Sequence, residues 1–351
     1  MPNPIQITDT YRSALAATFA HRSKGYVDQI SQRLALFWWL KRKGQYKSVG
    51  GGHRIEWPVF YELDTDDPSY SGLDTWTLQE QDPYTIAFAN WKHYEEPIVL
   101  PGIDVDVINA GERIFDLAKA LEDQALSSIQ HQMNDHMYAD GTGNSSKRIT
   151  GLDASLSEDP TTGTVYGINR ATETWWRSQI QDDGSGTSAV PAYASTEYTM
   201  RKGMNALYTK CGRGKGGKSR YPDLGLCSEV YLEAYDDMCN AIGQRFVNQN
   251  TADAGFQNLM FRGTTIIQDE DAPTDQTNTS TTTAAGPAQK CYFINSEFVE
   301  MAYAPRRNFR TRGKQDVINQ DAIVDHILWS GNLCVKQPRR CGVHIGIGMP
   351  T

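Results

Sequence analysis

The fold-deciding stretch runs from Asp104 to Tyr138 and reads DVDVINAGERIFDLAKALEDQALSSIQHQMNDHMY. Apolar residues recur in it at steps of three and four, which places them on one face of a helix. They are Ile114, Ala118, Leu121, Ala125, Ile129, Met133 and Met137. Asp104 and Asp106 suit the amino-terminal end of a helix dipole, and Gly141 stands where a helix commonly stops. The pattern predicts one long amphipathic helix, too polar on its other face to cross a membrane. Two shorter helices broken near Gly111 are the alternative.

Length and charge limit the classes of protein to consider. The chain has 351 residues, 39% of them hydrophobic, and a formal net charge of −8. That length can bury a large core, in two domains or in one with long excursions. A net negative chain is not expected to grip nucleic acid as its main task, because phosphate neutralisation needs a basic surface. The chain can still lie beside nucleic acid without holding it tightly.

The chain carries no recognisable export or membrane signal. Residues 1–9 lack the basic start and apolar run of a signal peptide, and the most apolar stretch, Leu34 to Leu40, is too short to span a bilayer. The cysteines include no Cys-x-x-Cys pair and are expected to be reduced and mostly buried; they are Cys211, Cys227, Cys239, Cys291, Cys334 and Cys341. We therefore expect a protein made in the cytoplasm, with no membrane partner.

Residues 1–45 are predicted to form a helical arm. One helix ends near Ala20, and a second runs from about Tyr26 to Lys43. The second helix is rich in large apolar side chains, including Trp38 and Trp39. Those side chains must pack either on the arm's own domain or on a neighbouring subunit.

Residues 46–101 are predicted to form a two-stranded ribbon. Alternating apolar residues from Ile55 to Tyr61 and a strand-like stretch from Tyr84 to Trp91 flank an acidic, turn-rich tip that contains Asp66 and Asp67. An isolated two-stranded ribbon is barely stable in water unless something covers it. The ribbon tryptophans are therefore predicted contact residues; they are Trp57, Trp76 and Trp91.

The second half of the chain alternates helix and strand signals. Helices are predicted at Thr196–Lys210 and Ser228–Ile242. Strands are predicted at Asp223–Leu226, Gly255–Met260, Thr264–Ile267, Cys291–Ile294, Ala322–Leu328 and Leu333–Val335. Residues 269–287 are acidic at first and then of low complexity, which predicts a solvated surface loop.

One motif could carry chemistry. The segment Gly212–Ser219 fits the phosphate-loop pattern, which needs a buried strand before it and a helix directly after it. Here a helix is predicted before it, and Pro222 disfavours a helix after it. A basic loop that touches an acidic partner surface is the preferred interpretation. With no histidine pair at metal-ligand spacing and no Gly-x-Ser-x-Gly motif, we predict no catalytic, cofactor-binding or metal-binding residues.

A basic cluster surrounds Phe309. It consists of Arg306, Arg307, Arg310, Arg312 and Lys314. It is either a solvated strand-and-loop face or a salt-bridging contact with the acidic ribbon tip of another copy.

The order of these parts resembles the major capsid protein of tailed bacteriophages, the Hong Kong 97-like fold. Three stretches are similar in detail. The first joins Gly151-Leu152-Asp153, Tyr166–Arg170 and Trp175-Trp176-Arg177; the second Tyr221–Leu224, Ser228 and Gln244-Arg245-Phe246; the third Gly255-Phe256, Phe261-Arg262-Gly263 and Asp269. The resemblance covers nearly the whole chain from about residue 10.

The resemblance implies an α+β fold with an arm (1–45), an extended two-stranded loop (46–101), a peripheral domain with a spine helix (102–170 and 301–351) and an axial domain (171–300). It implies a non-enzymatic protein without cofactors that assembles with itself through pentamers and hexamers into an icosahedral shell around double-stranded DNA. Expected partners are portal, scaffolding and decoration proteins, and the expected location is the virion, assembled in the host cytoplasm.

The predicted subunit-contact residues are Trp38, Trp39, Trp57, Asp66, Asp67, Trp76, Trp91, Arg306, Arg307 and Arg310. The alternatives are the shell of a bacterial nanocompartment, similar to an encapsulin, and a nucleotide-binding enzyme that uses the Gly212–Ser219 loop.

Overall fold

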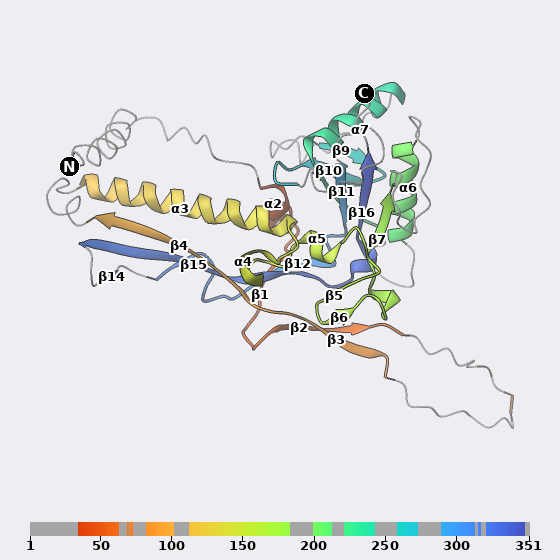
Figure 1. Ribbon diagram of the computed structural model, residues 1–351, viewed down its shortest axis with the longest axis horizontal. Coiled ribbons are helices and arrows are strands. Elements are labelled where there is room, and N and C mark those ends of the chain that lie inside the picture. The colour runs from red at the N-terminus through yellow and green to blue at the C-terminus, as the bar shows by residue number, and fades with distance from the viewer. Residues whose placement is uncertain are drawn as a thin grey trace. The chain divides into compact units, whose positions relative to one another are not determined.

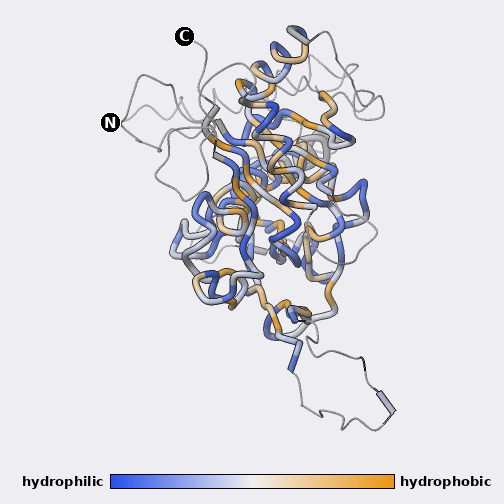
Figure 2. Tube along the Cα trace, turned by 90° about the vertical axis from the view of Figure 1, so that its right-hand side faces the viewer, coloured by the Kyte–Doolittle hydropathy of each residue, from blue (hydrophilic) through white to orange (hydrophobic). Residues whose placement is uncertain are grey.

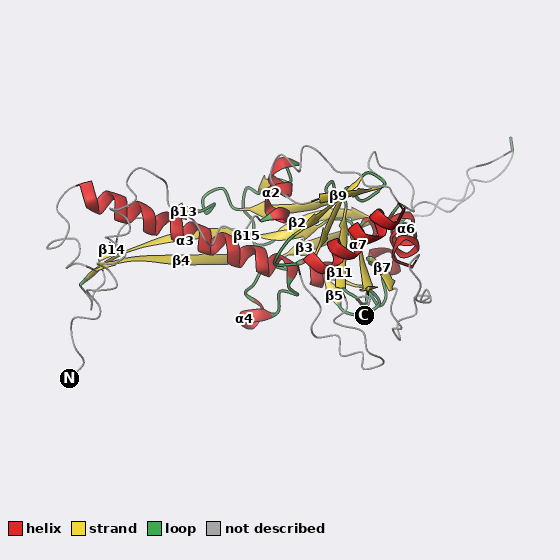
Figure 3. Ribbon diagram, turned by 90° about the horizontal axis from the view of Figure 1, so that it is seen from above, coloured by secondary structure: helices red, strands yellow, loops and turns green. Residues whose placement is uncertain are grey.

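The computed structural model describes residues 34–62, 69, 71–72, 82–101, 112–182, 199–212, 221–242, 258–272, 289–312, 315–316 and 321–347. These residues form helices and strands in an α+β arrangement, as predicted (Figures 1 and 3). The chain divides into two compact units. Unit 1 contains the described residues of His93–Met133 and Arg306–Trp329, and unit 2 those of Leu34–Lys92, Asn134–Pro305 and Ser330–Thr351. The predicted arm, extended loop, peripheral domain and axial domain have other boundaries than these two units, and they remain a prediction.

Unit 2 is built on a six-stranded sheet. Its strand order is β7 (Gln179–Asp182), β16 (Gly342–Ile347), β11 (Gln289–Ile294), β8 (Leu224–Cys227), β10 (Thr264–Gln268) and β9 (Asn258–Phe261). The β9–β10 hairpin turns at Gly263, whose φ of 92° is one that glycine adopts without steric cost. Strand β16 was not predicted, because its glycines weaken the strand signal.

Helices α6 (Thr199–Cys211) and α7 (Glu229–Ile242) pack in one apolar cluster with this sheet. Both were predicted, with bounds that differ by at most three residues. Polar and apolar residues are mixed along α7, the uppermost helix in Figure 2. Cys291 and Phe293 of β11 belong to the same cluster, and both are fully buried.

The neighbouring residue in β11 has a different partner. Tyr292 lies 6.3 Å between ring centroids from Tyr138, the last residue of α3 (Glu112–Tyr138). Gly151 precedes the short helix α5 (Leu152–Ser155), and a Cβ there would lie 2.1 Å from the carbonyl oxygen of Ala139. Only glycine fits this close approach of two backbones.

Helix α3 confirms the predicted amphipathic pattern where it is described. Ala125, Ile129, Met133 and Met137 are all buried. The predicted residues 104–111 lie outside the described part, as does the break proposed near Gly111.

A long strand, β15 (Ala322–Val335), contributes residues to both units. In unit 2 its end pairs with β12 (Val299–Tyr303), and β1 (Tyr46–Ser48) adds to β12 in parallel. In unit 1, β15 pairs with β4 (Lys92–Pro101), β13 (Arg310–Thr311) and β14 (Gln315–Asp316). The core of unit 1 contains Ile98, Ala125 and Ile327, with Leu121, Leu126 and Phe309 packed against them.

The described part of the arm, residues 34–45, packs on its own chain. In helix α2 (Ala35–Arg42), the side chains of Ala35, Leu36, Phe37, Trp39 and Leu40 are buried within unit 2. This is the first of the two alternatives for the arm. The predicted helix ending near Ala20 lies outside the described residues.

Shorter elements complete the fold. They are α4 (Gly143–Ser146), β5 (Thr164–Val165), β6 (Ile168–Asn169) and the 3₁₀ turns η2 (Thr174–Trp176) and η3 (Pro338–Arg340). All six cysteines are buried, as predicted, and none of them forms a disulfide bond. Within the described residues, none of the helices combines the length and the apolarity needed to cross a membrane.

Candidate subunit-contact surfaces

The ribbon consists of β2 (Ile55–Phe60) and β3 (Tyr84–Ala89), paired antiparallel with Ile55 opposite Ala89 and Phe60 opposite Tyr84. Successive side chains in a strand point to opposite faces, so this register defines two faces of the ribbon. The inner face carries Ile55, Trp57, Ala87 and Ala89, all of them buried.

The inner face is held by unit 2 itself. The Trp57 ring meets the Tyr166 ring edge-on, with centroids 5.2 Å apart. Tyr166 is itself fixed, because its hydroxyl contacts Ser155 Oγ at 2.8 Å and donates to the carbonyl oxygen of Leu333 at 3.1 Å. Burial raises the pKa of the Tyr166 phenol, so this hydroxyl stays neutral.

The outer face is apolar and exposed. We define it by Pro58, Phe60, Tyr84 and Ile86. Phe60 is 52% exposed, Tyr84 62% and Ile86 63%. The Phe60 and Tyr84 rings lie 5.2 Å apart, so they form one continuous surface. An exposed apolar surface of this kind marks a contact site in many soluble proteins.

At the base of the ribbon the same side is covered. The Arg54 guanidinium lies over the Phe88 ring, 4.4 Å from its centroid. Phe88 also lies against Gly167, where a Cβ would be 2.2 Å from the ring, and its backbone N–H donates to the carbonyl oxygen of Tyr166. The ribbon is therefore anchored at its base and exposes apolar side chains toward its tip.

The predicted tryptophans fall into three groups. Trp39 and Trp57 are 4% and 7% exposed, so contacts within the chain account for both. Trp38 and Trp91 are partly exposed; Arg42 lies over the Trp38 ring, and Trp91 Nε1 donates to the carbonyl oxygen of Gly52 at 3.0 Å. Trp76, with Asp66 and Asp67, lies outside the described residues.

The arginines of the basic cluster lie in unit 1, and Lys314 lies outside the described residues. Arg306, Arg307 and Arg310 are exposed, and within the described residues no carboxylate lies within ion-pair distance of them. Phe309 anchors the turn between them, because its ring packs into the core of unit 1. Its φ of 49° is unusual for a residue with a side chain, so the turn is held by its surroundings.

The electrostatics of this turn come from its guanidinium groups. Partial burial, and then the charge of Arg307, lower the pKa of His93. His93 therefore adds no positive charge to this surface at neutral pH. His326 Nδ1 and Glu95 Oε1 lie 2.6 Å apart in the same unit.

The phosphate-loop motif lacks its required setting. Helix α6 precedes it and strand β8 follows it, the reverse of the strand–loop–helix order that directs backbone amides at a phosphate. Residues 213–220 lie outside the described part. The order of the flanking elements argues against a nucleotide site.

Comparison with solved structures decides the fold. The chain matches, over 93% of its length, 96% of a chain in the cyanophage A-1(L) capsid asymmetric unit, with a TM-score of 0.62 and 16% sequence identity. The chain has the Hong Kong 97-like fold. The capsid of an empty GTA particle matches with a TM-score of 0.56 and 12% identity, covering 93% of this chain and 92% of that chain.

The Hong Kong 97-like fold is not confined to phage capsids. The holo-SrpI encapsulin complex from Synechococcus elongatus PCC 7942 matches with a TM-score of 0.51 and 11% identity, over 94% of each chain. Capsid and shell proteins of this fold are structural rather than enzymatic. No family model matches the chain, and no curated protein matches it either.

Sequence reasoning missed the outer face. It singled out tryptophans, whereas the most exposed large apolar residues of the ribbon are Phe60, Tyr84 and Ile86. A signal was present, because Trp57 and Phe60 are an odd number of positions apart and must point to opposite faces. Which of the two faces is covered depends on Tyr166, more than 100 residues further along the chain.

Proposed function

We propose that the chain is the major capsid protein of a tailed bacteriophage. In this proposal it assembles with itself through pentamers and hexamers into an icosahedral shell around double-stranded DNA, without catalysis or a cofactor. The observation that carries the proposal is the exposed apolar outer face of the ribbon on a chain with the Hong Kong 97-like fold. The phage capsid match and the net charge of −8, which suits a wall that does not clamp its contents, support it.

The outer face acts between subunits in this proposal. Burying an apolar side chain of this size stabilises a contact by roughly 1.5–3 kcal/mol. Phe60, Tyr84 and Ile86 are 52%, 62% and 63% exposed, so each would gain roughly half to two thirds of this by lying on a neighbouring copy. The same contact repeats at every subunit of a shell, so a modest gain per side chain suffices.

Further contact residues remain proposals. Trp38, Trp91, Arg306, Arg307 and Arg310 are exposed or partly exposed and stay in the contact set. Asp66, Asp67 and Trp76 stay in it on sequence grounds. Trp39 and Trp57 leave it, because contacts inside the chain already bury them. Portal, scaffolding and decoration proteins are proposed partners, and the virion is the proposed location.

Sedimentation of the recombinant protein, followed by electron microscopy of the fastest fraction, tests the proposal. Closed shells, or rings of five and six subunits, are the expected result. Deleting Asp64–Gly72 should impair assembly and leave thermal unfolding of the subunit unchanged. Normal shells from this deletion would contradict the role of the ribbon tip, and a chain that stays monomeric with co-expressed scaffolding protein would contradict the capsid proposal itself.

A nanocompartment shell is the second candidate. The encapsulin match, which extends over 94% of each chain, favours it. The contents of purified particles separate the two candidates. Nuclease-resistant DNA supports the capsid, and a protein cargo without DNA supports the nanocompartment.

A further inference from the structure

Helix α2 is held at its first residue by a carboxylate from a distant part of the chain. Asp269 follows β10, and its side chain is 3% exposed. Its Oδ2 accepts hydrogen bonds from the backbone N–H of Ala35 at 3.2 Å and from the Tyr138 hydroxyl at 2.8 Å. Its Oδ1 accepts from Asn134 Nδ2 at 3.1 Å and from the backbone N–H of Asp271 at 3.2 Å. One carboxylate thus joins three segments within unit 2.

This contact supplies a cap that α2 lacks locally. Leu34 at the N-cap position makes no side-chain capping bond, and the first turn of α2 contains no acidic residue. A free helix of eight residues is marginal in water, because so few hydrogen bonds offset the cost of nucleation. Asp269 therefore helps to hold α2 in place by accepting the Ala35 N–H, which its carboxyl can do in either protonation state.

Within the described part of the chain, the buried carboxylate has no positive partner. Among the described residues, no lysine, arginine or histidine lies within ion-pair distance of Asp269. The groups that face it are the Ala35 N–H from α2, Asn134 and Tyr138 from α3, and Asp271 from its own loop; in β8, the carbonyl oxygen of Cys227 accepts from the Asp269 N–H. The predicted solvated loop at 269–287 is wrong at this position, because these partners are remote in sequence.

The surroundings of Asp269 shift its protonation equilibrium toward the neutral carboxyl, relative to a carboxyl in water. Burial, together with the charge of Asp271, raises the pKa of Asp269, while the donated hydrogen bonds from Tyr138, Asp271 and Asn134 lower it, and burial dominates. The Tyr138 phenol has a pKa well above its ordinary value and stays neutral. It can therefore turn its O–H to accept from a protonated Asp269.

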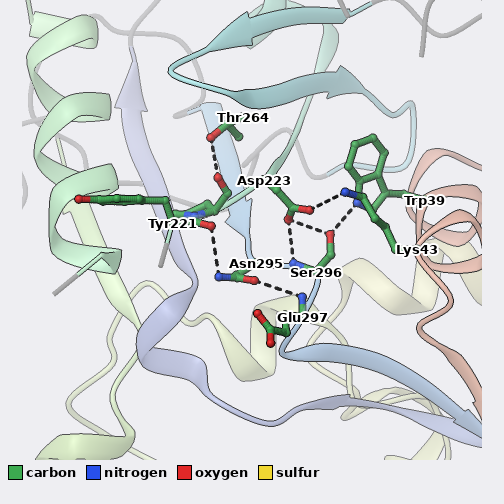
Figure 4. A network of polar contacts seen from close by, with 9 residues as sticks. Trp39, Lys43, Tyr221, Asp223, Thr264, Asn295, Ser296 and Glu297 are labelled. Carbon is green, nitrogen blue, oxygen red and sulfur yellow. Dashed lines mark hydrogen bonds and ion pairs between the residues drawn. The ribbon is translucent and has the colours of Figure 1, made fainter. Parts of the chain in front are cut away.

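The opposite end of α2 is held differently. Lys43 Nζ lies 3.1 Å from Asp223 Oδ2, and Asp223 Oδ1 accepts from the N–H and the hydroxyl of Ser296, both at 2.8 Å (Figure 4). Ser296 Oγ in turn accepts from Trp39 Nε1 at 2.7 Å (Figure 4). This carboxylate is paired with a cation and is partly exposed.

We propose that docking of α2 onto its own chain is coupled to the uptake of a proton at Asp269. When α2 detaches, water reaches Asp269 and its carboxyl returns toward ordinary acidity. Docking therefore raises its pKa, and the stabilisation of the docked state is fully present below the ordinary carboxyl range. It decreases as the pH rises through the raised pKa. This goes beyond the proposed function, because it concerns one subunit before assembly.

Hydrogen exchange of the purified, unassembled full-length chain tests the proposal. The measurement follows the peptide that contains residues 34–43 over a series of pH values, after correction for intrinsic exchange. In the wild type, protection should fall as the pH rises, by up to about tenfold per pH unit, the limit for one proton. In Asp269→Asn the remaining protection should not depend on pH.

Two further variants shift the transition in opposite directions. Tyr138→Phe removes a donor to the carboxylate and should move the fall in protection to higher pH. Asp271→Asn removes a negative neighbour and should move it to lower pH. Asp223→Asn, the control at the other end of α2, should reduce protection at every pH alike.

The outcomes are decisive even if one variant fails to fold. Wild-type pH dependence in Asp269→Asn overturns the proposal. If that variant does not fold, shifts of Tyr138→Phe and Asp271→Asn in the same direction, or no shift in either, overturn it. Because shells are not needed, the result is independent of the proposed function.

Discussion

Two six-residue strands of similar apolar character, β11 and β3, have opposite environments. In β11, Cys291, Tyr292, Phe293 and Ile294 are all fully buried, with neighbours on both faces of the strand. In β3 the two alanines are buried, whereas Tyr84 and Ile86 are more than 60% exposed. Strand β3 thus places its small side chains on the inner face and its large ones on the outer face.

This inversion indicates what each strand is for. Ala87 is opposite Trp57 and Ala89 is opposite Ile55, so the small residues make room for large partners on the inner face. A strand that only had to stabilise its own subunit would bury its largest side chains. The large outer residues of β3 are therefore best explained by a partner.

The largest expected effect lies in β11. Phe293→Ala should lower the free energy of unfolding by about 3–5 kcal/mol, because it leaves a cavity in a fully buried cluster. The matched substitution Ile86→Ala on the outer face should change it by less than about 0.5 kcal/mol. Urea unfolding followed by circular dichroism measures both, and equal losses would remove the contrast between the strands.

Assembly should show the reverse. The double variant Tyr84→Ser, Ile86→Ser should leave the free energy of unfolding nearly unchanged. It should lose about 1 kcal/mol or more of subunit contact per side chain, because Tyr84 and Ile86 are 62% and 63% exposed before assembly. The protein concentration needed for assembly, measured by light scattering, should rise by tenfold or more. Glu56→Ser, on an exposed polar residue of β2, is the control. Unchanged assembly of the double variant would show that the outer face has no partner.

A smaller effect is expected where the ribbon meets unit 2. Gly167→Ala places a methyl group against Phe88 at a residue whose φ is 82°, and should cost about 1–3 kcal/mol of unfolding free energy. Gly263→Ala is the control, because its φ is 92° but its Cβ meets open space. The difference between the two, from parallel thermal melts, isolates the contact with Phe88. Equal costs would mean that this contact does not anchor the ribbon.

The smallest effect is expected at the basic turn. Arg307→Glu with Arg310→Glu should weaken assembly by about 1 kcal/mol or less per charge, and the loss should shrink as sodium chloride is added. Adding Asp66→Arg and Asp67→Arg should restore assembly if the acidic ribbon tip is the partner. If the reversed arginines assemble normally at low salt, the turn is only a solvated surface.

Local signals predicted much of the fold. Helices α6 and α7 and the β9–β10 hairpin follow from periodicity, capping and a turn glycine, all of which act within a few residues. The sequence predicted two strands with a break between Leu328 and Leu333, because Ser330-Gly331-Asn332 has the composition of a turn. This break is wrong, since β15 is continuous from Ala322 to Val335. Asn332 stays within β15 because its side chain binds the Thr150 N–H and the carbonyl oxygen of Asn90, at 2.9 Å each.

Partners remote in sequence could not be predicted. Trp39 was assigned to a subunit contact, yet its indole binds Ser296, 257 residues away. Asp269 was assigned to a solvated loop, yet its partners begin at residue 35. In both cases the partner is more than 200 residues away, so the residues next to Trp39 or Asp269 in sequence carry no information about it.

The three-residue strand β1 also disfavours one kind of polymer, a fibre built by strand pairing through β12. Gln45 accepts from the N–H of Met301, and the N–H of Val49 donates to Tyr303, so the outer edge of β12 is occupied. An open edge there would accept a strand from another molecule, and that molecule would offer the same edge again, as in a growing fibre. Because β1 has only three residues and Gly50-Gly51-Gly52 follow shortly after its end at Ser48, it presents little edge for further pairing. A subunit whose β12 edge is covered by β1 cannot add further copies through that edge, so β12 does not compete with the contacts that close a shell.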